Sequence, residues 1–309
     1  MWGCRTLKIP IITGPTAVGK SEIALKLARL VDGEIISVDS MQIYTYMDIG
    51  TSKVSKEIRN EIPHHLIDIV NPDEDFDVKK FRDMALESVE SIISKGKKPI
   101  LAGGSGLYVE ALKYGIFEGP SKNKTLRKAL TEVEEESPGA LRKLLFAIDP
   151  IAYEKFGKND MIRTIRAIEV YISTGRKISD LWNERIEDGR FITFVIERDR
   201  KELYDIIDRR VEEMFKAGFI DEVAHLIDMG YSTKLKSMRS IGYKEVVQYL
   251  EGILSLEECM NEIKLLTRHY AKRQLIWFRK DENAVWLNLS EGEDRMVDKI
   301  LKILNWGAL

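Results

Sequence analysis

The residues Gly14-Pro15-Thr16-Ala17-Val18-Gly19-Lys20-Ser21 decide the fold of this 309-residue chain, because they form the pattern G-x-x-x-x-G-K-S. The apolar run before them (9–13) predicts a strand, and the amphipathic segment after them (21–30) predicts a helix. In this order the three parts form a phosphate-binding loop, in which backbone N–H groups and a positive helix terminus surround an anion. Lys20 adds a point charge for a phosphate oxygen, and the hydroxyl of Ser21 suits a magnesium ion.

Short apolar runs and amphipathic segments alternate through the first hundred residues, which is typical of βα units around a parallel sheet. Further strands are expected at 34–38, 99–102 and 191–196, with an edge strand at 284–289 and helices at 78–94 and 107–112. Residues 122–187 are charged and helical. We therefore expect an α/β fold with a P-loop NTPase-like parallel sheet core. Its parts would be the first part of the core (1–121), a helical insertion (122–188), and the second part with a helical C-terminal region (189–309).

Composition excludes several classes of protein. The chain has 48 Lys and Arg against 50 Asp and Glu, so any nucleic-acid surface must be a local patch. Cys4 and Cys259 are too few for a disulfide framework or a zinc site, and we expect two reduced thiols. No signal peptide and no apolar stretch of about 18 residues is visible, so we expect a cytosolic protein with no membrane segment. The adjacent His64 and His65 suit a structural role better than a metal site.

The acid at Asp39 decides which phosphate chemistry the loop serves. A nucleotide kinase carries an acid after a later strand, but here the strand at 99–102 runs into Gly103-Gly104. Asp39 instead follows the strand at 34–38, at the carboxyl edge of the sheet where substrates bind in such folds. It could be a water-mediated metal ligand, a general base, or a turn cap.

Six motifs in order resemble a known family. After the phosphate loop come Asp39-Ser40-Met41-Gln42-Ile43-Tyr44, Asp48-Ile49-Gly50-Thr51-Ser52-Lys53, Pro63-His64-His65-Leu66-Ile67-Asp68, Gly103-Gly104-Ser105-Gly106-Leu107-Tyr108 and Arg239-Ser240-Ile241-Gly242-Tyr243-Lys244. Together they resemble the tRNA dimethylallyltransferases, also called tRNA isopentenyltransferases. The resemblance runs from residue 9 to about residue 286.

The resemblance implies a reaction and its machinery. The dimethylallyl group of dimethylallyl diphosphate would pass to N6 of adenosine 37, in the anticodon loop of tRNA, with release of diphosphate. The phosphate loop (residues 14–21) would hold the diphosphate rather than ATP, with Lys20 and a Mg²⁺ ion at Ser21 neutralising the leaving group. Asp39 matches the family's general base, and the hydroxyls of Thr16 and Ser105 would lie near the reacting groups. The family default is a monomer.

The resemblance also implies contacts with tRNA, whose adenosine 37 must be flipped out of its stack to expose N6. The residues implied are Asp39, Ser40, Met41, Gln42, Ser105, Arg127, Ile162, Arg163, Thr164, Ile165, Arg166, Arg239, Ser240, Ile241, Gly242, Tyr243 and Lys244. The last long helix adds support from its own pattern, since basic residues recur along it and aromatic residues interleave with them. They are Lys264, Arg268, Lys272, Arg273, Arg279 and Lys280, with Tyr270, Trp277 and Phe278.

Two positions depart from the family pattern. Ser105 stands where threonine is common, which keeps the hydroxyl. Met214 aligns with a diphosphate-side arginine of some members, a role that a neighbour such as Arg210 could take. Two cysteines are too few for the C-terminal zinc finger that eukaryotic relatives carry.

Three alternative functions are open to the sequence. A small-molecule P-loop kinase or NTPase would need no RNA-facing C-terminal half. An adenylate isopentenyltransferase would need neither the helical insertion nor the basic tail. A non-catalytic RNA-binding regulator would not need Lys20, Ser21 and Asp39 intact.

Overall fold

The computed structural model describes residues 7–117 and 119–307. Its centre is a six-stranded parallel sheet with strand order β3-β2-β4-β1-β5-β6. The strands are β1 (Ile9–Thr13), β2 (Gly33–Ser37), β3 (His64–His65), β4 (Lys98–Ala102), β5 (Phe191–Glu197) and β6 (Val285–Asn288). The strands predicted at 9–13, 34–38, 99–102 and 191–196 are β1, β2, β4 and β5, and their ends lie within one residue of those expected. β6 is an edge strand, as expected for 284–289.

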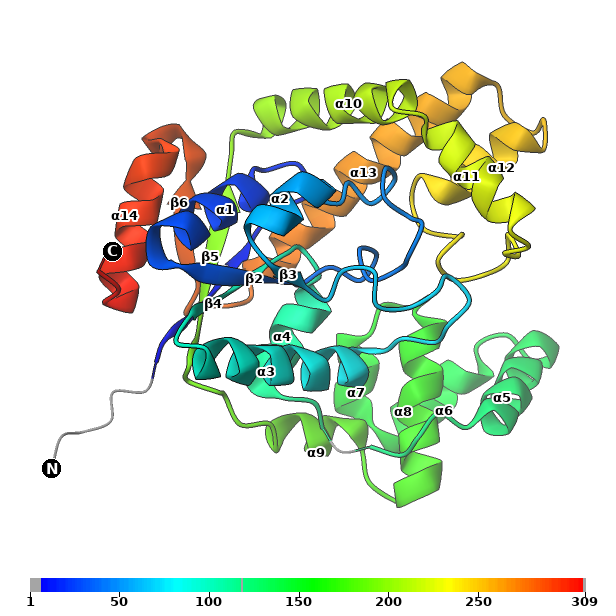
Figure 1. The fold of residues 1–309 in the computed structure, drawn as a ribbon. Helices are drawn as coiled ribbons and strands as arrows, with labels where there is room; N and C mark the ends of the chain where they lie inside the picture. The colour runs from blue at the N-terminus through cyan, green and yellow to red at the C-terminus, as the bar shows by residue number, and fades with distance from the viewer. Residues whose placement is uncertain (1–6, 118, 308–309) are drawn as a thin grey trace, which may run out of the picture. The chain divides into compact units, whose positions relative to one another are not determined.

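Helices flank this sheet on both faces (Figure 1). The helices of residues 7–114 and 191–307 are α1 (Lys20–Val31), α2 (Lys56–Glu61), α3 (Val78–Ser94), α4 (Gly106–Tyr114), α10 (Arg200–Lys216), α11 (Phe219–Asp228), α12 (Tyr243–Leu250), α13 (Leu256–Phe278) and α14 (Glu293–Leu304), with a short 3-10 turn at Leu289–Glu291. The predicted helix at 78–94 is α3.

Neighbouring residues of one strand belong to different cores, because successive side chains of a strand point to opposite faces. Ile11 packs in one buried cluster, with residues of α3, α4 and α11. Ile12 packs in the other cluster, with residues of α1 and α14. Burial on both faces explains why these strands are continuous apolar runs rather than alternating ones.

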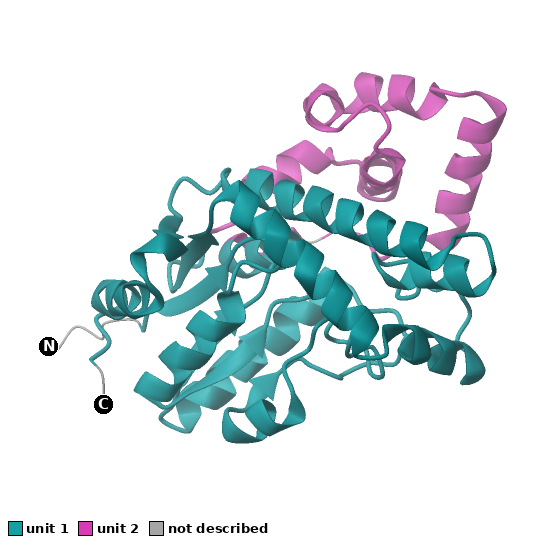
Figure 2. Cartoon of the chain, turned by 90° about the horizontal axis from the view of Figure 1, so that it is seen from above, with its two compact units in different colours: residues 1–113, 188–309 teal, residues 114–187 magenta. Residues whose placement is uncertain are grey.

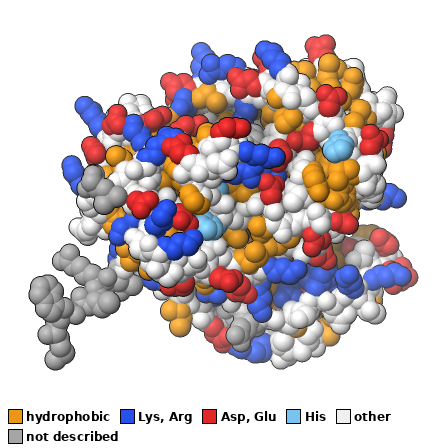
Figure 3. Space-filling view, viewed as in Figure 1, with side chains coloured by type: hydrophobic (Ala, Val, Ile, Leu, Met, Phe, Trp, Pro, Cys, Tyr) orange, Lys and Arg blue, Asp and Glu red, His pale blue; other side chains and the backbone are white. Residues whose placement is uncertain are grey.

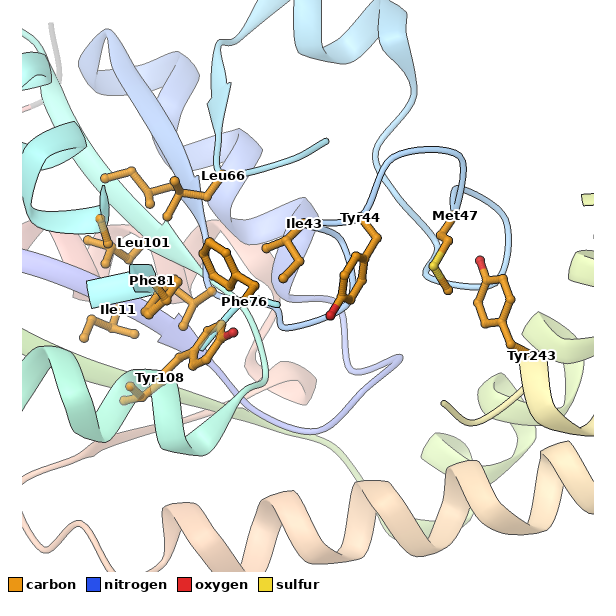
Figure 4. Packing of buried hydrophobic residues seen from close by; sticks show 14 of the residues in the cluster. Ile11, Ile43, Tyr44, Met47, Leu66, Phe76, Phe81, Leu101, Tyr108 and Tyr243 are labelled. Carbon is orange, nitrogen blue, oxygen red and sulfur yellow. The ribbon is translucent and has the colours of Figure 1, made fainter. Parts of the chain in front are cut away.

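The first of these clusters contains a stacked aromatic pair (Figure 4). The rings of Phe81 on α3 and Tyr108 on α4 lie 3.9 Å apart at an interplanar angle of 12°. Phe76, Ile43 and Tyr44 pack in the same cluster. The segment that follows β2 is thereby anchored in the core, and with it the turn that carries Asp39.

The chain divides into two compact units (Figure 2). Unit 1 comprises residues 1–113 and 188–309 and contains the sheet, whereas unit 2 comprises residues 114–187. The helices of unit 2 are α5 (Lys124–Glu136), α6 (Ala140–Ile148), α7 (Pro150–Lys155), α8 (Met161–Thr174) and α9 (Ile178–Asn183). Unit 2 has apolar cores of its own, centred on residues such as Leu145 and Ile168.

Candidate active site

The phosphate loop connects β1 to α1 in a conformation that its glycines make possible. Gly14 has φ +141°, and a Cβ there would lie closer than 3.0 Å to the carbonyl oxygen of Ile196 on β5. Gly19 has φ +103° and precedes the first residue of α1. The N-cap residue, Gly19, has no side chain that could cap this helix start. Its N–H groups are therefore available to an anion, as in other helix N-termini that bind phosphate.

Two cationic side chains act on this loop. Nζ of Lys20 donates a hydrogen bond to the carbonyl oxygen of Pro15 at 2.7 Å. Burial lowers the pKa of Lys20 from 10.5 to about 8, and the charge of Arg210 lowers it in the same direction, whereas Asp39 opposes the shift. Arg210 lies on α10 and its Nε donates to Oγ of Ser52 at 2.8 Å. The site therefore concentrates positive charge where a diphosphate would need it.

Arg210 and Met214 lie one turn apart on α10 and differ in what they could offer a diphosphate. Met214, one turn further along α10, packs against the buried cluster that contains Phe219. Its thioether offers no charge to a phosphate. The charges of Arg210, Lys20 and Asp39 influence one another, so Arg210 is the candidate on α10 for the role that Met214 cannot take.

Asp39 caps a turn with one carboxylate oxygen. Its Oδ1 accepts hydrogen bonds from the backbone N–H groups of Met41 at 2.8 Å and Gln42 at 3.4 Å. Oδ2 has no hydrogen-bond partner among the described residues. The turn-cap role that the sequence suggested is therefore present, and it leaves the second oxygen of the half-buried carboxylate available for another proton or ligand.

Ser105 joins the ends of β2 and β4, which are neighbours in the sheet. Its Oγ accepts from the backbone N–H of Ser40 at 3.0 Å and donates to Oγ of Ser40 at 3.4 Å. Tyr270, on α13, lies near Ser105, and burial together with the charge of Asp39 raises the pKa of its hydroxyl. Asp39, Ser105 and Tyr270 thus form one polar group at the carboxyl edge of the sheet.

Gln274 of α13 is a site residue that sequence reasoning missed. Its Oε1 accepts from the backbone N–H of Thr16 at 2.8 Å, and its Nε2 donates to the carbonyl oxygen of Gly104 at 2.8 Å. The buried side chain thereby ties the phosphate loop to the loop that carries Ser105. Thr16 lies 258 residues away along the chain, so no local pattern indicated this role.

The basic stripe predicted on α13 is a free surface only in part, because two of its six basic residues are neutralised by acids of α10, which corrects the sequence analysis. Lys264 forms an ion pair with Glu212, and Arg268 pairs with Asp208, both on α10. Phe278 is buried in the core, so it cannot stack on a base. The exposed basic residues of this region are Lys272, Arg273, Arg279 and Lys280.

The segment 239–244 is divided between surface and core. Arg239 and Lys244 are exposed, whereas Gly242 and Tyr243 are buried. The hydroxyl of Tyr243 donates to Oε1 of Glu222 at 2.6 Å, and burial raises its pKa well above the usual value. The side chain of Tyr243 therefore supports the site from inside rather than facing a substrate.

Unit 2 contains a cluster of two arginines around one carboxylate. Glu169 has no exposed surface and accepts from Nε and an Nη of Arg127 and from an Nη of Arg166. Burial alone would raise the pKa of Glu169, but Arg127, Arg166 and the N–H of Asn123 lower it to about 2. Both arginines are partly exposed, so they are held in place with some of their N–H groups outward.

The remaining predicted contacts of unit 2 lie around this cluster on α8. Ile162 is 81% exposed, and Arg163 is exposed and pairs with Asp160. Thr164 and Ile165 have buried side chains, so they pack α8 rather than present a surface. A row of basic side chains is visible at the lower right of Figure 3, where Figure 1 places helices of unit 2.

Glu169→Gln should lower the free energy of unfolding by roughly 2 kcal/mol, because it leaves two arginines without their anionic partner. The loss should be smaller than for a fully buried pair, since the arginine side chains are 28% and 27% exposed. Urea unfolding measures it. Glu132→Gln is the matched control, because its partner Lys128 is exposed, and it should change stability by less than about 0.5 kcal/mol. Equal effects of the two would contradict a structural role for the cluster.

Each of the adjacent histidines contacts an oxygen atom of the protein. Nε2 of His65 contacts Oε2 of Glu34 at 2.8 Å, and Nδ1 of His64 contacts the carbonyl oxygen of Ile62 at 2.7 Å. No group of three or more His, Cys, Asp or Glu that could hold a metal occurs in residues 7–117 and 119–307. Any divalent ion would therefore take most of its ligands from substrate and water, as Mg²⁺ commonly does. The exposed hydroxyl of Ser21 fits such a site.

Comparisons with known proteins place this geometry in a family. A family model described as IPP transferase matches residues 42–281. The chain belongs to the IPP transferase family. The tRNA dimethylallyltransferase of Thermotoga neapolitana is 48% identical over 298 residues, which cover 96% of this chain and 98% of that protein.

Solved structures of IPP transferases share the fold. The tRNA isopentenylpyrophosphate transferase of Bacillus halodurans is 37% identical with a TM-score of 0.73, and the match covers 96% of this chain and 97% of that one. A eukaryotic dimethylallyltransferase acting on tRNA is 28% identical with a TM-score of 0.84, covering 98% of this chain and 81% of that one. The P-loop-like α/β core that this chain shares with these structures is the fold class expected from the sequence.

Two further expectations concern features outside the site. Cys259 is a free, buried thiol, whereas Cys4 lies outside the described residues. In the part of the chain that the structure describes, no helix is both long and apolar enough to cross a membrane.

Proposed function

We propose that this IPP transferase moves the dimethylallyl group of dimethylallyl diphosphate to N6 of adenosine 37 in tRNA and releases diphosphate. The observation that carries the proposal is the charge of Asp39 beside Lys20 and Arg210, with Oδ2 of Asp39 unpartnered among the described residues. A phosphate-binding loop and a carboxylate that can accept a proton are what this reaction requires. The name shared by the relatives agrees with it.

The leaving group would be stabilised by the phosphate loop. The N–H groups at the start of α1 and the charges of Lys20 and Arg210 surround the place of the diphosphate, where negative charge grows as the C–O bond breaks. A Mg²⁺ ion bound through Ser21 would neutralise further charge on the diphosphate. The phosphate-loop residues from Gly14 to Ser21, Thr16 among them, would hold the diphosphate in place.

The acceptor nitrogen needs a base. The lone pair of an adenine amino group is delocalised into the ring, so the nitrogen becomes acidic only as the C–N bond forms. Asp39 would accept that proton on Oδ2, while its Oδ1 stays in the turn with Met41 and Gln42. Ser105 and Ser40 lie beside this carboxylate and would orient the adenine.

Recognition of tRNA is proposed for both units. In unit 2 we assign it to Arg127, Ile162, Arg163 and Arg166, within the predicted insertion 122–188. In the second part of the core (189–309) we assign it to Arg239, Ser240, Ile241, Lys244 and the exposed basic residues that follow α13. Such contacts would hold phosphates and the flipped nucleotide. We propose that the protein acts as a monomer in the cytoplasm, where its tRNA substrate is found.

One assay tests the proposal and its alternatives. The protein is incubated with unmodified tRNA, radiolabelled dimethylallyl diphosphate and Mg²⁺, and in parallel with AMP in place of tRNA. We expect label in the tRNA alone. Equal labelling of AMP would favour an adenylate isopentenyltransferase, and no label in either acceptor would contradict the proposal. Phosphoryl transfer from ATP under the same conditions would favour a kinase.

The pH dependence of donor use should report on Lys20. Its pKa is lowered to about 8, so the lysine of the free enzyme loses its positive charge as the pH rises through this value. Binding of an anionic diphosphate favours the charged form, and kcat/KM for the donor should therefore fall above pH 8. Lys20→Arg should remove this fall, because a guanidinium keeps its charge there. An unchanged alkaline profile in Lys20→Arg would assign the fall to another group.

A further inference from the structure

Glu222 of α11 collects four hydrogen bonds. Its Oε2 accepts from the backbone N–H groups of Asp48 at 2.9 Å and Ile49 at 2.7 Å. Its Oε1 accepts from the N–H of Gly50 at 3.1 Å and from the hydroxyl of Tyr243 at 2.6 Å. Each oxygen of this carboxylate accepts two hydrogen bonds, and three of the four come from a distant loop. Such an arrangement is a strong and directional anchor.

The loop is also packed onto the ring of Tyr243. A Cβ at Gly50 would lie closer than 3.0 Å to the rings of Tyr243 and Phe219, so only glycine allows this approach. The rings of Phe219 and Tyr243 meet edge to face at 5.1 Å. In Figure 4 the ring of Tyr243 lies beside Met47, at the start of the loop. Glu222, Phe219 and Tyr243 together form a seat for residues 48–50.

Hydrogen bonds within the loop fix its shape, but they do not fix its position against the rest of the protein. The N–H of Ser52 donates to the carbonyl oxygen of Ile49 at 3.0 Å, and the N–H of Lys53 donates to that of Asp48 at 3.0 Å. These bonds close a turn within the loop. Glu222 is what ties the turn to α11, 174 residues away in sequence.

The far end of the loop reaches the donor site. Oγ of Ser52 accepts from Nε of Arg210 at 2.8 Å, and the charge of Arg210 acts on Lys20. The carbonyl oxygens of Thr51 and Ser52 accept from Nε2 of Gln42 at 3.3 and 3.4 Å. The position of this one loop therefore influences both the diphosphate side and the turn of Asp39.

We propose that Glu222 is a positioning residue for the donor site, which acts through the 48–52 loop and Ser52 to hold Arg210 against the phosphate loop. The proposal rests on the proposed function, because it takes Arg210 to bind the diphosphate of the prenyl donor. Glu222 itself touches neither substrate. In this proposal Tyr243, for which the resemblance implied a contact with tRNA, has a role inside the protein.

Glu222→Gln tests this role. A glutamine presents one oxygen and one NH₂, so in either orientation at least one backbone N–H that now donates to Glu222 faces an NH₂ group instead of an acceptor. We expect the KM for dimethylallyl diphosphate to rise about tenfold, as for loss of one charge-assisted hydrogen bond. The KM for tRNA should change less than about twofold, since the variant leaves unit 2 and the exposed basic residues intact. Asp221→Asn is the control, because it removes the same charge from the same helix without a bond to the loop.

Ser52→Ala separates positioning from general destabilisation. It removes the link to Arg210 and leaves the seat of the loop untouched, and it should also raise the donor KM. If Glu222 acts through Ser52, the double variant should lose less than the product of the two single effects. Independent, multiplying effects would overturn the proposal, as would an unchanged donor KM in Glu222→Gln.

Failure of the proposed function and failure of the positioning role give different results. If the wild-type protein labels no tRNA, the proposed function fails and the donor KM has no meaning. If the wild type labels tRNA and both variants keep the wild-type donor KM, only the positioning role fails. Should Glu222→Gln not fold, Ser52→Ala decides, because a raised donor KM supports the link from the loop to Arg210 and an unchanged one overturns it.

Discussion

Asp39→Asn should lower kcat by about two to four powers of ten, the usual contribution of a general base. The substitution is nearly isosteric. The amide oxygen can keep the bonds from Met41 and Gln42 that Oδ1 now accepts, so the turn is retained. The NH₂ group then takes the place of Oδ2, where it cannot accept a proton from N6 of the adenine.

Single-turnover transfer with saturating donor measures this loss, and equilibrium binding measures the affinity for tRNA. We expect the affinity to change less than about threefold, because one hydrogen bond to the adenine is a small part of an interface dominated by phosphates. An equal loss of turnover and affinity would make Asp39 a binding residue. A lowered melting temperature would instead indicate that the turn had been disrupted.

Gly103→Ala should lower the free energy of unfolding by at least about 3 kcal/mol and abolish transfer, the second large effect. A Cβ at Gly103 would lie closer than 3.0 Å to the carbonyl oxygen, carbonyl carbon and Cα of Val38. These are backbone atoms, which cannot rotate away. The N–H of Gly103 also donates to the carbonyl oxygen of Ile12, and its own carbonyl oxygen accepts from Oγ1 of Thr13. The methyl group would therefore force β2 and β4 apart where Asp39 and Ser105 meet.

Denaturant unfolding and a transfer assay well below the melting temperature measure the two parts of this effect. Gly157→Ala is the matched control, because an added Cβ there meets nothing within 4 Å. It should keep both stability and activity. Full activity in a folded Gly103→Ala protein would show that the ends of β2 and β4 tolerate separation, which the proposed site does not.

Local sequence indicated the parts of the site that follow strands. Thr13 and Ser37 end strands that are buried on both faces, so their apolar runs mark where the phosphate loop and Asp39 begin. Parallel strands bring their carboxyl ends to one edge. The motif at 14–21 and the acid at 39 could therefore be placed together without coordinates.

Helix α13 shows why pattern alone misjudged a surface. Lys264 and Arg268 form a basic stripe by spacing, but the acids that neutralise them, Glu212 and Asp208, lie 52 and 60 residues earlier. Gln274 follows Lys272 and Arg273 in the same helix, and only the packed structure shows that it joins Thr16 to Gly104. Spacing along one helix identifies a face, but not what that face meets.

The sequence by itself determined the parallel α/β core, the phosphate loop and the acid at Asp39, because these depend on short runs of adjacent residues and on the regular geometry of strands and helices. Only the tertiary structure decided that Arg210 binds Ser52, that Tyr243 is buried, and that Glu222 and Gln274 make hydrogen bonds to loops of the site. Each of those roles depends on contacts between residues far apart in the chain. Such contacts are set by how whole elements pack, which no local pattern records.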